Sequence, residues 1–224
     1  MTAGGAGSRA GTPLPKLELP LLGRPLVYYA LLAFEQAVSI ERVILVVPAE
    51  RLGAWGPDRL AREGLAKVTA TLAGGDTRQQ SVRNAIDAIP ERRGTVVIHD
   101  GARPLVTAGL IDSVADIPDQ VDGLIAAVPV TDTIKVVDVA RVTGTPDRSS
   151  LVAVQTPQAF RLEVLRASHQ QASSDGFVAT DDSALVERWG GTVQVVAGDR
   201  ENLKVTYPED VKRAEEILMA RGIG

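Results

Sequence analysis

Patterns typical of helices and of buried strands alternate along most of the chain. Apolar residues recur every three or four positions from Leu26 to Phe34, and this spacing predicts a helix over residues 26–37. A continuous, largely β-branched run follows at 43–47, and it indicates a strand buried on both faces, hence a parallel sheet. The same alternation predicts strands at 67–72, 96–98, 124–130 and 192–196, and helices at 57–63, 79–88, 107–116, 162–171, 181–189 and 208–221.

The alternation breaks in the middle of the chain. Strand-like stretches at 133–138 and 151–154 flank a polar, turn-rich piece at 142–148, with no helical pattern between them. This arrangement predicts an antiparallel β arm that projects from the sheet. We therefore expect a single α/β domain over residues 1–224, with a β arm inserted at about 133–154.

Composition and charge exclude several classes of function. The chain of 224 residues is 45% hydrophobic and carries a formal net charge of −4, so no basic excess points to a nucleic-acid partner. There are no cysteines, which excludes disulfides and thiolate metal sites. No apolar run has transmembrane length and no signal segment opens the chain. We expect a cytoplasmic protein that acts on small molecules, without a membrane partner.

A glycine cluster followed by two cations stands near the start of the chain. Glycine is costly to order, so such a cluster needs a reason, and one reason is close approach of backbone N–H groups to a phosphate. The other interpretation is a frayed terminus. The spacing matches neither the Walker A nor the dinucleotide pattern. The cluster and its cations are Gly4-Gly5-Ala6-Gly7-Ser8-Arg9 and Pro15-Lys16.

The strand that should lead into this loop is missing from the pattern. In α/β nucleotide folds a glycine loop leaves the carboxyl end of a buried strand, but only Met1, Thr2 and Ala3 precede the loop here. We expect a start that has been cut short, because loss of a central strand would expose the ladder groups of its neighbours.

A second candidate site follows the predicted strand at 96–98. That end of a parallel strand faces the ligand crevice, so Asp100 could hold Mg²⁺ or a sugar hydroxyl and Arg103 could pair with an anion. The alternatives are that Asp100 caps the following turn and that Arg103 forms a surface ion pair. His99 is interpreted as structural, and no nucleophile elbow supports a hydrolytic triad. Taken singly, Gly75-Asp76, Thr133, Arg148, Thr156, Thr180 and Lys204 are ordinary turn or surface residues.

Seven motifs stand in order along the chain. They are Gly5-Ala6-Gly7-Ser8-Arg9 with Pro15-Lys16, Gly74-Gly75-Asp76, His99-Asp100-Gly101-Ala102-Arg103-Pro104, Thr131-Asp132-Thr133-Ile134-Lys135, Gln155-Thr156-Pro157-Gln158, Thr180-Asp181-Asp182 and Asn202-Leu203-Lys204-Val205-Thr206. Together they resemble the motifs of the 2-C-methyl-D-erythritol 4-phosphate cytidylyltransferase family. The resemblance runs from residue 3 to the end of the chain, although Thr2-Ala3-Gly4 replaces the family's Pro-Ala-Ala.

The resemblance implies a fold, a reaction and a set of site residues. The fold is a Rossmann-like, mostly parallel nucleotidyltransferase sheet whose β arm forms a homodimer, with Arg148 acting in the partner's site. The reaction transfers a cytidylyl group from CTP to the polyol phosphate, with Mg²⁺ and release of pyrophosphate. Arg9, Lys16, Arg148 and Lys204 would be catalytic. CTP would be bound by Ala3, Gly4, Gly5, Ala6, Gly7, Ser8, Gly75, Asp76, Ser81, Asp100 and Ala102, and the polyol phosphate by Arg103, Thr133, Arg148, Thr156, Thr180 and Lys204.

Two other functions stay open at this point. One is a cytidylyltransferase for another polyol phosphate, such as ribitol 5-phosphate, which would share the CTP motifs. The other is a non-catalytic nucleotide-binding protein. The presence of both Arg9 and Lys16 argues against the second, because a binder needs no cations aimed at a transition state.

Overall fold

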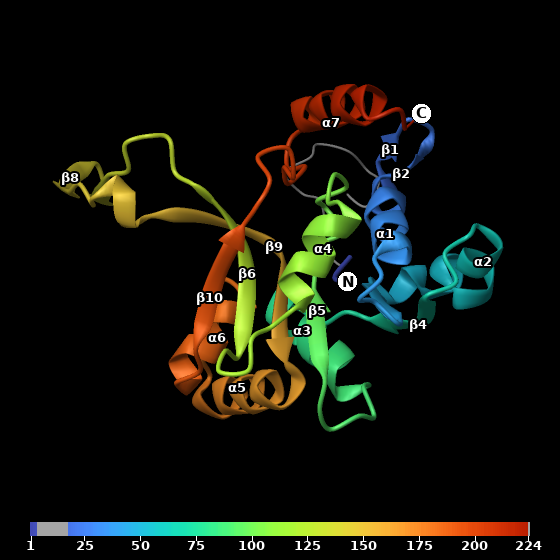
Figure 1. The fold of residues 1–224 in the computed structure, drawn as a ribbon, viewed down its shortest axis with the longest axis horizontal. Coiled ribbons are helices and arrows are strands. Elements are labelled where there is room, and N and C mark those ends of the chain that lie inside the picture. Colours follow the sequence, from blue (N-terminus) through green and yellow to red (C-terminus); the bar gives the residue numbers. More distant parts are fainter. Residues whose placement is uncertain (4–17, 224) are drawn as a thin grey trace.

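The computed structural model describes residues 1–3 and 18–223, and its centre is a mixed β-sheet (Figure 1). Strand β6 lies between the parallel β10 and the antiparallel β9, and β9 in turn pairs antiparallel with β5. A second, parallel pair consists of β3 and β4. The bounds are β3 Val43–Val47, β4 Val68–Ala73, β5 Thr95–Ile98, β6 Gly123–Pro129, β9 Val152–Arg161 and β10 Val193–Ala197.

The first three residues join these two groups of strands. Thr2 forms parallel bridges with Val46 on one side and with Asp100 on the other. Its amide donates to the carbonyl of His99 at 2.9 Å, and the amide of Ala3 donates to the carbonyl of Val46 at 2.7 Å. Met1 to Ala3 form no strand, as the sequence pattern predicts, although Thr2 bridges β3 and Asp100, which lies just after β5.

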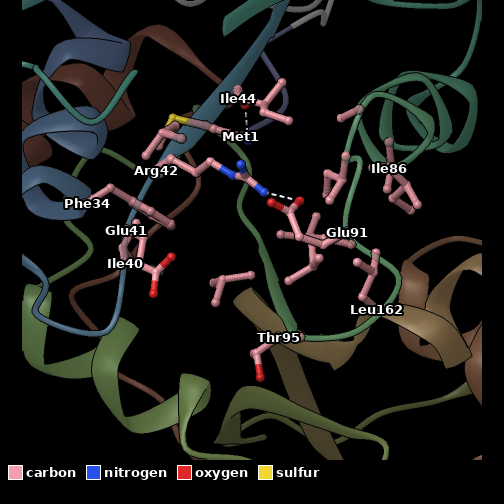
Figure 2. A pocket seen from close by; sticks show the side chains of 18 of the residues that line it. Met1, Phe34, Ile40, Glu41, Arg42, Ile44, Ile86, Glu91, Thr95 and Leu162 are labelled. Atoms are coloured by element: carbon pink, nitrogen blue, oxygen red, sulfur yellow. Dashed lines mark hydrogen bonds and ion pairs between the residues drawn. The ribbon is translucent and has the colours of Figure 1, made fainter. Parts of the chain in front are cut away.

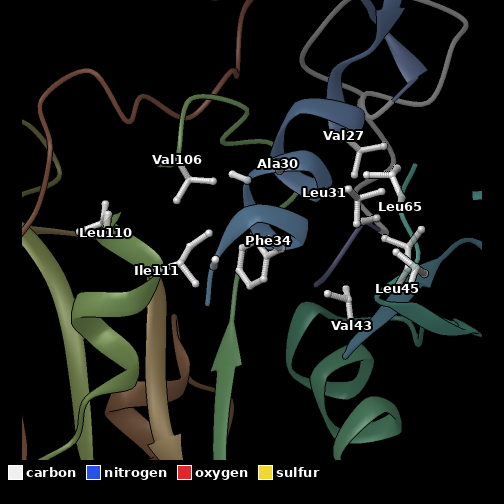
Figure 3. Packing of buried hydrophobic residues seen from close by; sticks show 14 of the residues in the cluster. Val27, Ala30, Leu31, Phe34, Val43, Leu45, Leu65, Val106, Leu110 and Ile111 are labelled. Carbon is white, nitrogen blue, oxygen red and sulfur yellow. The ribbon is translucent and has the colours of Figure 1, made fainter. Parts of the chain in front are cut away.

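Helices cover both faces of the sheet. On one face, α1 (Leu26–Gln36) and α4 (Ala108–Ala115) enclose the largest apolar cluster, in which Phe34 lies at the centre of the packing (Figure 3). On the other face, α3 (Arg78–Asp87), α5 (Leu162–Asp175) and α6 (Asp182–Trp189) pack around the buried ring of Phe160. The remaining helical segments are the 3₁₀ turns Ala49–Trp55 and Arg148–Ser150, α2 (Pro57–Arg62) and α7 (Pro208–Ala220). The predicted α/β fold is confirmed.

Strand β9 differs most from the sequence-based expectation. We expected a short arm strand at 151–154, but β9 runs for 10 residues and enters the sheet antiparallel to β5 and β6. Residues 155–158 in its middle are mostly polar in sequence yet buried, and their side chains bond to distant parts of the chain. Gln155 donates to the carbonyl of Asp199 at 2.8 Å, and Gln158 donates to Asp181 at 2.9 Å.

The β arm is present, with a different pairing from the expected one. Strand β7 (Val136–Asp138) pairs antiparallel with β8 (Arg141–Gly144), which overlaps the piece at 142–148 that the sequence predicts to be a turn. The start of β9 pairs instead with the end of β6 at the base of the arm. In Figure 1 the hairpin stands clear of the sheet. The short β1 (Pro20–Leu21) and β2 (Arg24–Pro25) form a further hairpin ahead of α1. Within residues 1–3 and 18–223, no helix is both long and apolar enough to span a membrane.

Close packing between β6 and β9 predicts a size-sensitive position. A Cβ atom on Gly123 would lie 2.4 Å from Cδ1 of Phe160, whose ring is fully buried. We expect Gly123→Ala to lower the free energy of unfolding by about 1–3 kcal/mol, because the ring has no free space to enter. Urea denaturation measures this change.

Gly109→Ala is the matched control. Gly109 lies in α4, and a Cβ atom there would have no neighbour within 4 Å. Because alanine is the better helix former, this variant should be neutral or more stable by up to about 1 kcal/mol. Equal effects of the two substitutions would contradict the packing argument.

Candidate active site

The carboxyl ends of β3, β5 and the Met1–Ala3 segment meet at one edge of the sheet, where Asp100 lies. Asp100 is 8% exposed, and two cations from distant parts of the chain contact its two oxygens. Nε of Arg78 donates to Oδ1 at 2.9 Å, and Nζ of Lys204 donates to Oδ2 at 2.6 Å. The fold therefore places the carboxylate of Asp100 between the cationic groups of Arg78 and Lys204.

These ion pairs fix the charge of Asp100. Burial alone would raise the pKa of this carboxyl, but Arg78 and Lys204 outweigh it and hold the pKa well below its usual value. Burial alone would also lower the pKa of Arg78, whereas the carboxylates of Asp182 and Asp100 raise it above its usual value. Asp100 and Arg78 therefore both enter the site in their ionised forms at neutral pH.

Sequence reasoning missed the support behind Arg78. Nη1 of Arg78 donates to Oδ2 of Asp182 at 2.6 Å, and the other oxygen of Asp182 lies 3.0 Å from Nε2 of His169. Asp182 and His169 are both almost fully buried. This network ties the start of α3 to α5 and α6. The only signal in the sequence was the place of Arg78, directly after the glycine turn at the edge of the sheet.

His99 is a structural, neutral histidine. Its Nε2 lies 3.1 Å from the carbonyl oxygen of Arg103, which can only accept, so Nε2 carries the proton. Its Nδ1 then accepts from the hydroxyl of Thr156 at 3.2 Å. Burial lowers the pKa of His99 to about 3. The ring therefore holds the loop after β5 and does not transfer protons at neutral pH.

Thr156 supports Asp100 from behind. Its hydroxyl oxygen accepts from the amide of Asp100 at 3.0 Å, in addition to its bond with His99. The side chain is 5% exposed. The expectation that Thr156 binds a substrate stays a prediction, since both contacts of its hydroxyl lie within the fold.

The loop after Asp100 positions Ala102 and Arg103. The amide of Val205 donates to the carbonyl of Ala102 at 2.9 Å, and Nη1 of Arg103 donates to the carbonyl of Asn202 at 2.7 Å. These bonds bring the segment that carries Lys204 to the site. Burial lowers the pKa of Arg103, and its Nε is buried without a partner among the described residues.

Three further predicted residues lie in the turn between β4 and α3 or in the helix that follows it. The amide of Gly75 donates to the hydroxyl of the buried Ser81 at 3.1 Å, and the amide of Asp76 donates to Gln80 at 3.2 Å. A Cβ atom on Gly75 would lie 2.4 Å from Cγ of Gln80, so the turn is closed tightly at this position. Asp76 is exposed. Because Arg78 begins α3 and contacts Asp100, this turn lies beside Asp100.

Two residues that we expect to bind the polyol phosphate lie away from this edge of the sheet. Thr133 and Arg148 lie on the β arm, where both line a cavity of ≈ 640 Å³. Nη1 of Arg148 donates to the carbonyl of Thr131 at 2.7 Å, and both side chains are exposed. Thr180 is exposed beside Asp181, the N-cap of α6. Ala3 is buried at the sheet edge, whereas Gly4, Gly5, Ala6, Gly7, Ser8, Arg9 and Lys16 lie outside the described residues.

One carboxylate at this edge suits a divalent cation carried by phosphates. Among the residues that the structure describes, no group of three acidic, histidine or cysteine side chains could hold a metal alone. Mg²⁺ commonly uses one or two carboxylates together with substrate phosphates and water. The ionised carboxylate of Asp100 fits this pattern.

Known proteins resemble this chain in sequence and in structure. Residues 1–220 match the sequence model of the family described as 2-C-methyl-D-erythritol 4-phosphate cytidylyltransferase. An enzyme of that name from Rubrobacter xylanophilus is 46% identical over 221 residues, covering 98% of this chain and 93% of the relative. One from Geobacter metallireducens is 40% identical over 219 residues, with 96% and 94% covered. The crystal structure of one from Thermus thermophilus has a TM-score of 0.76 at 33% identity and covers 94% of this chain and 96% of its own.

The neutral His99 predicts a loss of stability in mild acid. The unfolded chain takes up a proton on this ring as the pH falls below 6.5, whereas the folded chain does so only near pH 3. Stability is therefore present above pH 6.5 and falls as the pH decreases towards 3. Between pH 6.5 and 5 we expect His99 to account for a loss of about 2 kcal/mol in the free energy of unfolding.

Urea denaturation at several pH values, on the natural chain and on His99→Gln, measures this contribution. The Met1 amine adds a loss of the same sign, because burial lowers its pKa from 8.0 to about 5. The variant should be less stable at pH 7 but should show a shallower decline between pH 6.5 and 5. An equally steep decline in both proteins would show that His99 is not the group responsible.

Proposed function

This chain belongs to the 2-C-methyl-D-erythritol 4-phosphate cytidylyltransferase family, and we propose that its two substrates meet at the edge occupied by Asp100. The enzyme is a nucleotidyltransferase of the methylerythritol phosphate route to isoprenoid precursors. It transfers the cytidylyl group of CTP to 2-C-methyl-D-erythritol 4-phosphate, giving 4-diphosphocytidyl-2-C-methyl-D-erythritol and pyrophosphate.

The reaction calls for fixed positive charge more than for proton transfer. A phosphate oxygen of the polyol phosphate attacks the α-phosphorus of CTP, and the bond to the bridging oxygen of pyrophosphate breaks. The attacking group is already an anion near neutral pH, so it needs no general base. Negative charge grows on the α-phosphate and on the leaving group, and preorganised cations stabilise it. We propose Arg9, Lys16, Arg148 and Lys204 as these cations.

The observation that carries the choice of this edge, and of Lys204 among the four cations, is the charge cluster of Arg78, Asp100 and Lys204. Lys204 lies 2.6 Å from Asp100 and is 45% exposed, so its ammonium group is both held in place and open to a ligand. Arg78 is anchored by the buried Asp182 and keeps Asp100 ionised. We propose that Asp100 is the protein ligand of Mg²⁺, which, when bound, neutralises phosphate charge on CTP and on the departing pyrophosphate.

Backbone and small side chains surround the proposed CTP site. We assign the triphosphate and cytosine to the stretch from Ala3 to Ser8, and the base and ribose to Gly75, Asp76 and Ser81. The closed turn at Gly75 supports this assignment, because its amides hold fixed orientations. Asp100 and Ala102 complete the CTP side. Fixed backbone donors and acceptors can distinguish cytosine from uracil, whose edge has the opposite polarity.

We propose that the polyol phosphate lies against Arg103, Thr156, Thr180 and Lys204, with Thr133 and Arg148 supplied by a second copy. The arm supports this proposal because it carries exposed apolar side chains. Val137 is 59% exposed, Val139 99% and Val142 54%. Such residues on a projecting hairpin are typical of a surface that a partner covers. The active unit would be a homodimer of single-domain chains of residues 1–224, working in the cytoplasm without nucleic-acid or membrane partners.

The alcohol substrate is tested directly by pyrophosphate release. We expect release from CTP with 2-C-methyl-D-erythritol 4-phosphate, and release at least about a hundredfold slower with ribitol 5-phosphate, because a site built for one polyol's hydroxyls leaves polar groups unpaired with another. UTP in place of CTP is the control for the base. Release with ribitol 5-phosphate alone would instead establish a cytidylyltransferase for that polyol phosphate.

Complementation between two inactive variants tests the dimer. We expect Lys16→Ala and Arg148→Ala each to lower kcat by about 10²–10³, as loss of one preorganised contact does. If Arg148 acts in the partner's site, a mixed dimer contains one site with both residues intact. An equal mixture, exchanged and reassembled, should then recover about a quarter of the natural activity.

The same mixture made with a double variant is the control. Lys16→Ala/Arg148→Ala mixed with Lys16→Ala gives no intact site in either arrangement. Recovery in the first mixture and none in the second supports the assignment. No recovery in either mixture, with subunit exchange verified, would place Arg148 in the site of its own chain.

A further inference from the structure

Lys204 lies in a stretch of the chain that has no regular secondary structure. Strand β10 ends at Ala197 and α7 begins at Pro208, and residues 198–207 between them form neither a helix nor a strand. Fixing irregular backbone costs conformational entropy, which contacts must offset. The position of Lys204 at 2.6 Å from Asp100 therefore needs anchors that the hydrogen bonds of the sheet do not provide.

Gln155 of β9 supplies the first anchor. Its Nε2 donates to the carbonyl of Asp199 at 2.8 Å, and its Oε1 accepts from the amide of Asp199 at 3.2 Å. The side chain thereby pairs with both backbone groups of one residue, as a neighbouring strand would. Gln155 is 7% exposed, and a Cβ atom on Gly198 would lie 2.6 Å from its Oε1. The segment is therefore closely packed against β9 at this point.

Asn202 supplies the second anchor, two residues before Lys204. The side chain is fully buried, and its Nδ2 donates to the carbonyl of Thr156 at 2.9 Å and to Oε1 of Gln155 at 3.4 Å. Both partner atoms are acceptors, so only a donor suits this position. The carbonyl of Asn202 in turn accepts from Nη1 of Arg103 at 2.7 Å. Asn202 therefore joins the segment of Lys204 to β9 and to the loop after β5.

An irregularity in β9 leaves the carbonyl of Thr156 available to Asn202. Strand β9 pairs with β6 at Gln158 and again at Val154, and between these points three residues of β9 lie opposite a single residue of β6. Thr156 has no register partner in β5 or in β6. Bulges are over-represented next to active sites, where they redirect side chains or interrupt pairing. Here the interruption frees a backbone acceptor that the Asn202 side chain uses.

The residue after Lys204 is also held in place. The amide of Val205 donates to the carbonyl of Ala102 at 2.9 Å, and its side chain is 1% exposed in an apolar cluster with Leu105 and Leu218. The side chain of Lys204 is 45% exposed, although buried residues lie on both sides of it in the chain. The backbone on these two sides therefore determines where the ammonium group can reach.

We propose that Asn202 is a positioning residue for Lys204, and that Gln155 supports it by holding Asp199. Asn202 fixes the backbone two residues before Lys204, and this keeps the ammonium group within reach of Asp100 and of the attacking phosphate. The inference rests on the proposed function, in which Lys204 stabilises charge on the reacting phosphates. Asparagine suits the role because it donates without carrying a charge, whereas an aspartate would direct only acceptors at the acceptors around it.

The kinetics of Asn202→Leu test the proposal. Leucine has a similar shape but no donor, so we expect kcat/KM for 2-C-methyl-D-erythritol 4-phosphate to fall by about 10- to 100-fold through misplacement of Lys204. The KM for CTP should change by less than about twofold, because the contacts of Asn202 lie on the side of the polyol phosphate. Gln155→Met removes the bonds to Asp199 at a similar side-chain length. It should show the same split to a smaller degree, and it serves if Asn202→Leu does not fold.

A double-mutant cycle separates positioning from stability. In the Lys204→Ala background, Asn202→Leu should lower kcat/KM by less than about threefold more, because the group that it positions is already absent.

Leu162→Ala is the control for lost stability. Leu162 is 2% exposed and lies at the other end of β5, where it lines a cavity together with Thr95 (Figure 2). This variant should lower Tm by several degrees through loss of core packing, and it should leave kcat/KM of the folded enzyme within about twofold of the natural value.

Three results would overturn the inference. They are additive losses in the cycle, an Asn202→Leu variant as active as the natural chain, and an equal loss of kcat/KM in Leu162→Ala, because lost stability would then explain both variants. Failure of the proposed function has a different signature. A Lys204→Ala variant with the natural kcat/KM would overturn the proposed role of Lys204 itself, whatever the Asn202 variant does.

Discussion

The backbone pairing of Met1, Thr2 and Ala3 joins the two halves of the central sheet. In the described part of the chain, these residues supply the ladder bonds between β3 and β5. A three-residue connection is short for this purpose, since strands in globular proteins usually have five or six residues. Among the described residues, no strand longer than this connection lies between β3 and β5. The order of the sheet and the position of Asp100 thus depend on a small number of hydrogen bonds.

The site at the carboxyl edge depends on a second constraint, which is the ionised carboxylate of Asp100 in a buried place. Burial of a charge is tolerated only where partners compensate it, and here Arg78 and Lys204 do so. Arg78 can hold this position because Asp182 shares its guanidinium. The neutral ring of His99 fixes the neighbouring loop without adding charge. These buried polar groups therefore hold the charged residues in place at one edge of the sheet.

The local pattern of apolar and polar residues was sufficient to predict most helices and strands. It was insufficient to predict which polar residues are buried. The strand Val43–Val47 and the helix Leu26–Gln36 follow from apolar spacing alone. Strand β9 does not, because the burial of its polar middle depends on bonds to residues that lie more than 20 positions away. The pairing of Arg78 with Asp182 spans 104 positions and leaves no local trace. Asp100 could be placed at the site because it follows a buried strand, whereas Lys204 could be placed there only by resemblance to a family.

The pairing of Asp100 with Lys204 has a consequence for the heat of ligand binding. Asp100 is held far below its usual pKa before any substrate arrives, so a ligand meets a carboxylate and not an acid. In the proposed site, a cation that binds Asp100 would leave the protonation of this carboxyl unchanged. Because Asp100 neither takes up nor releases a proton, it adds no buffer ionisation heat to the measured enthalpy of binding near neutral pH, whichever buffer is chosen.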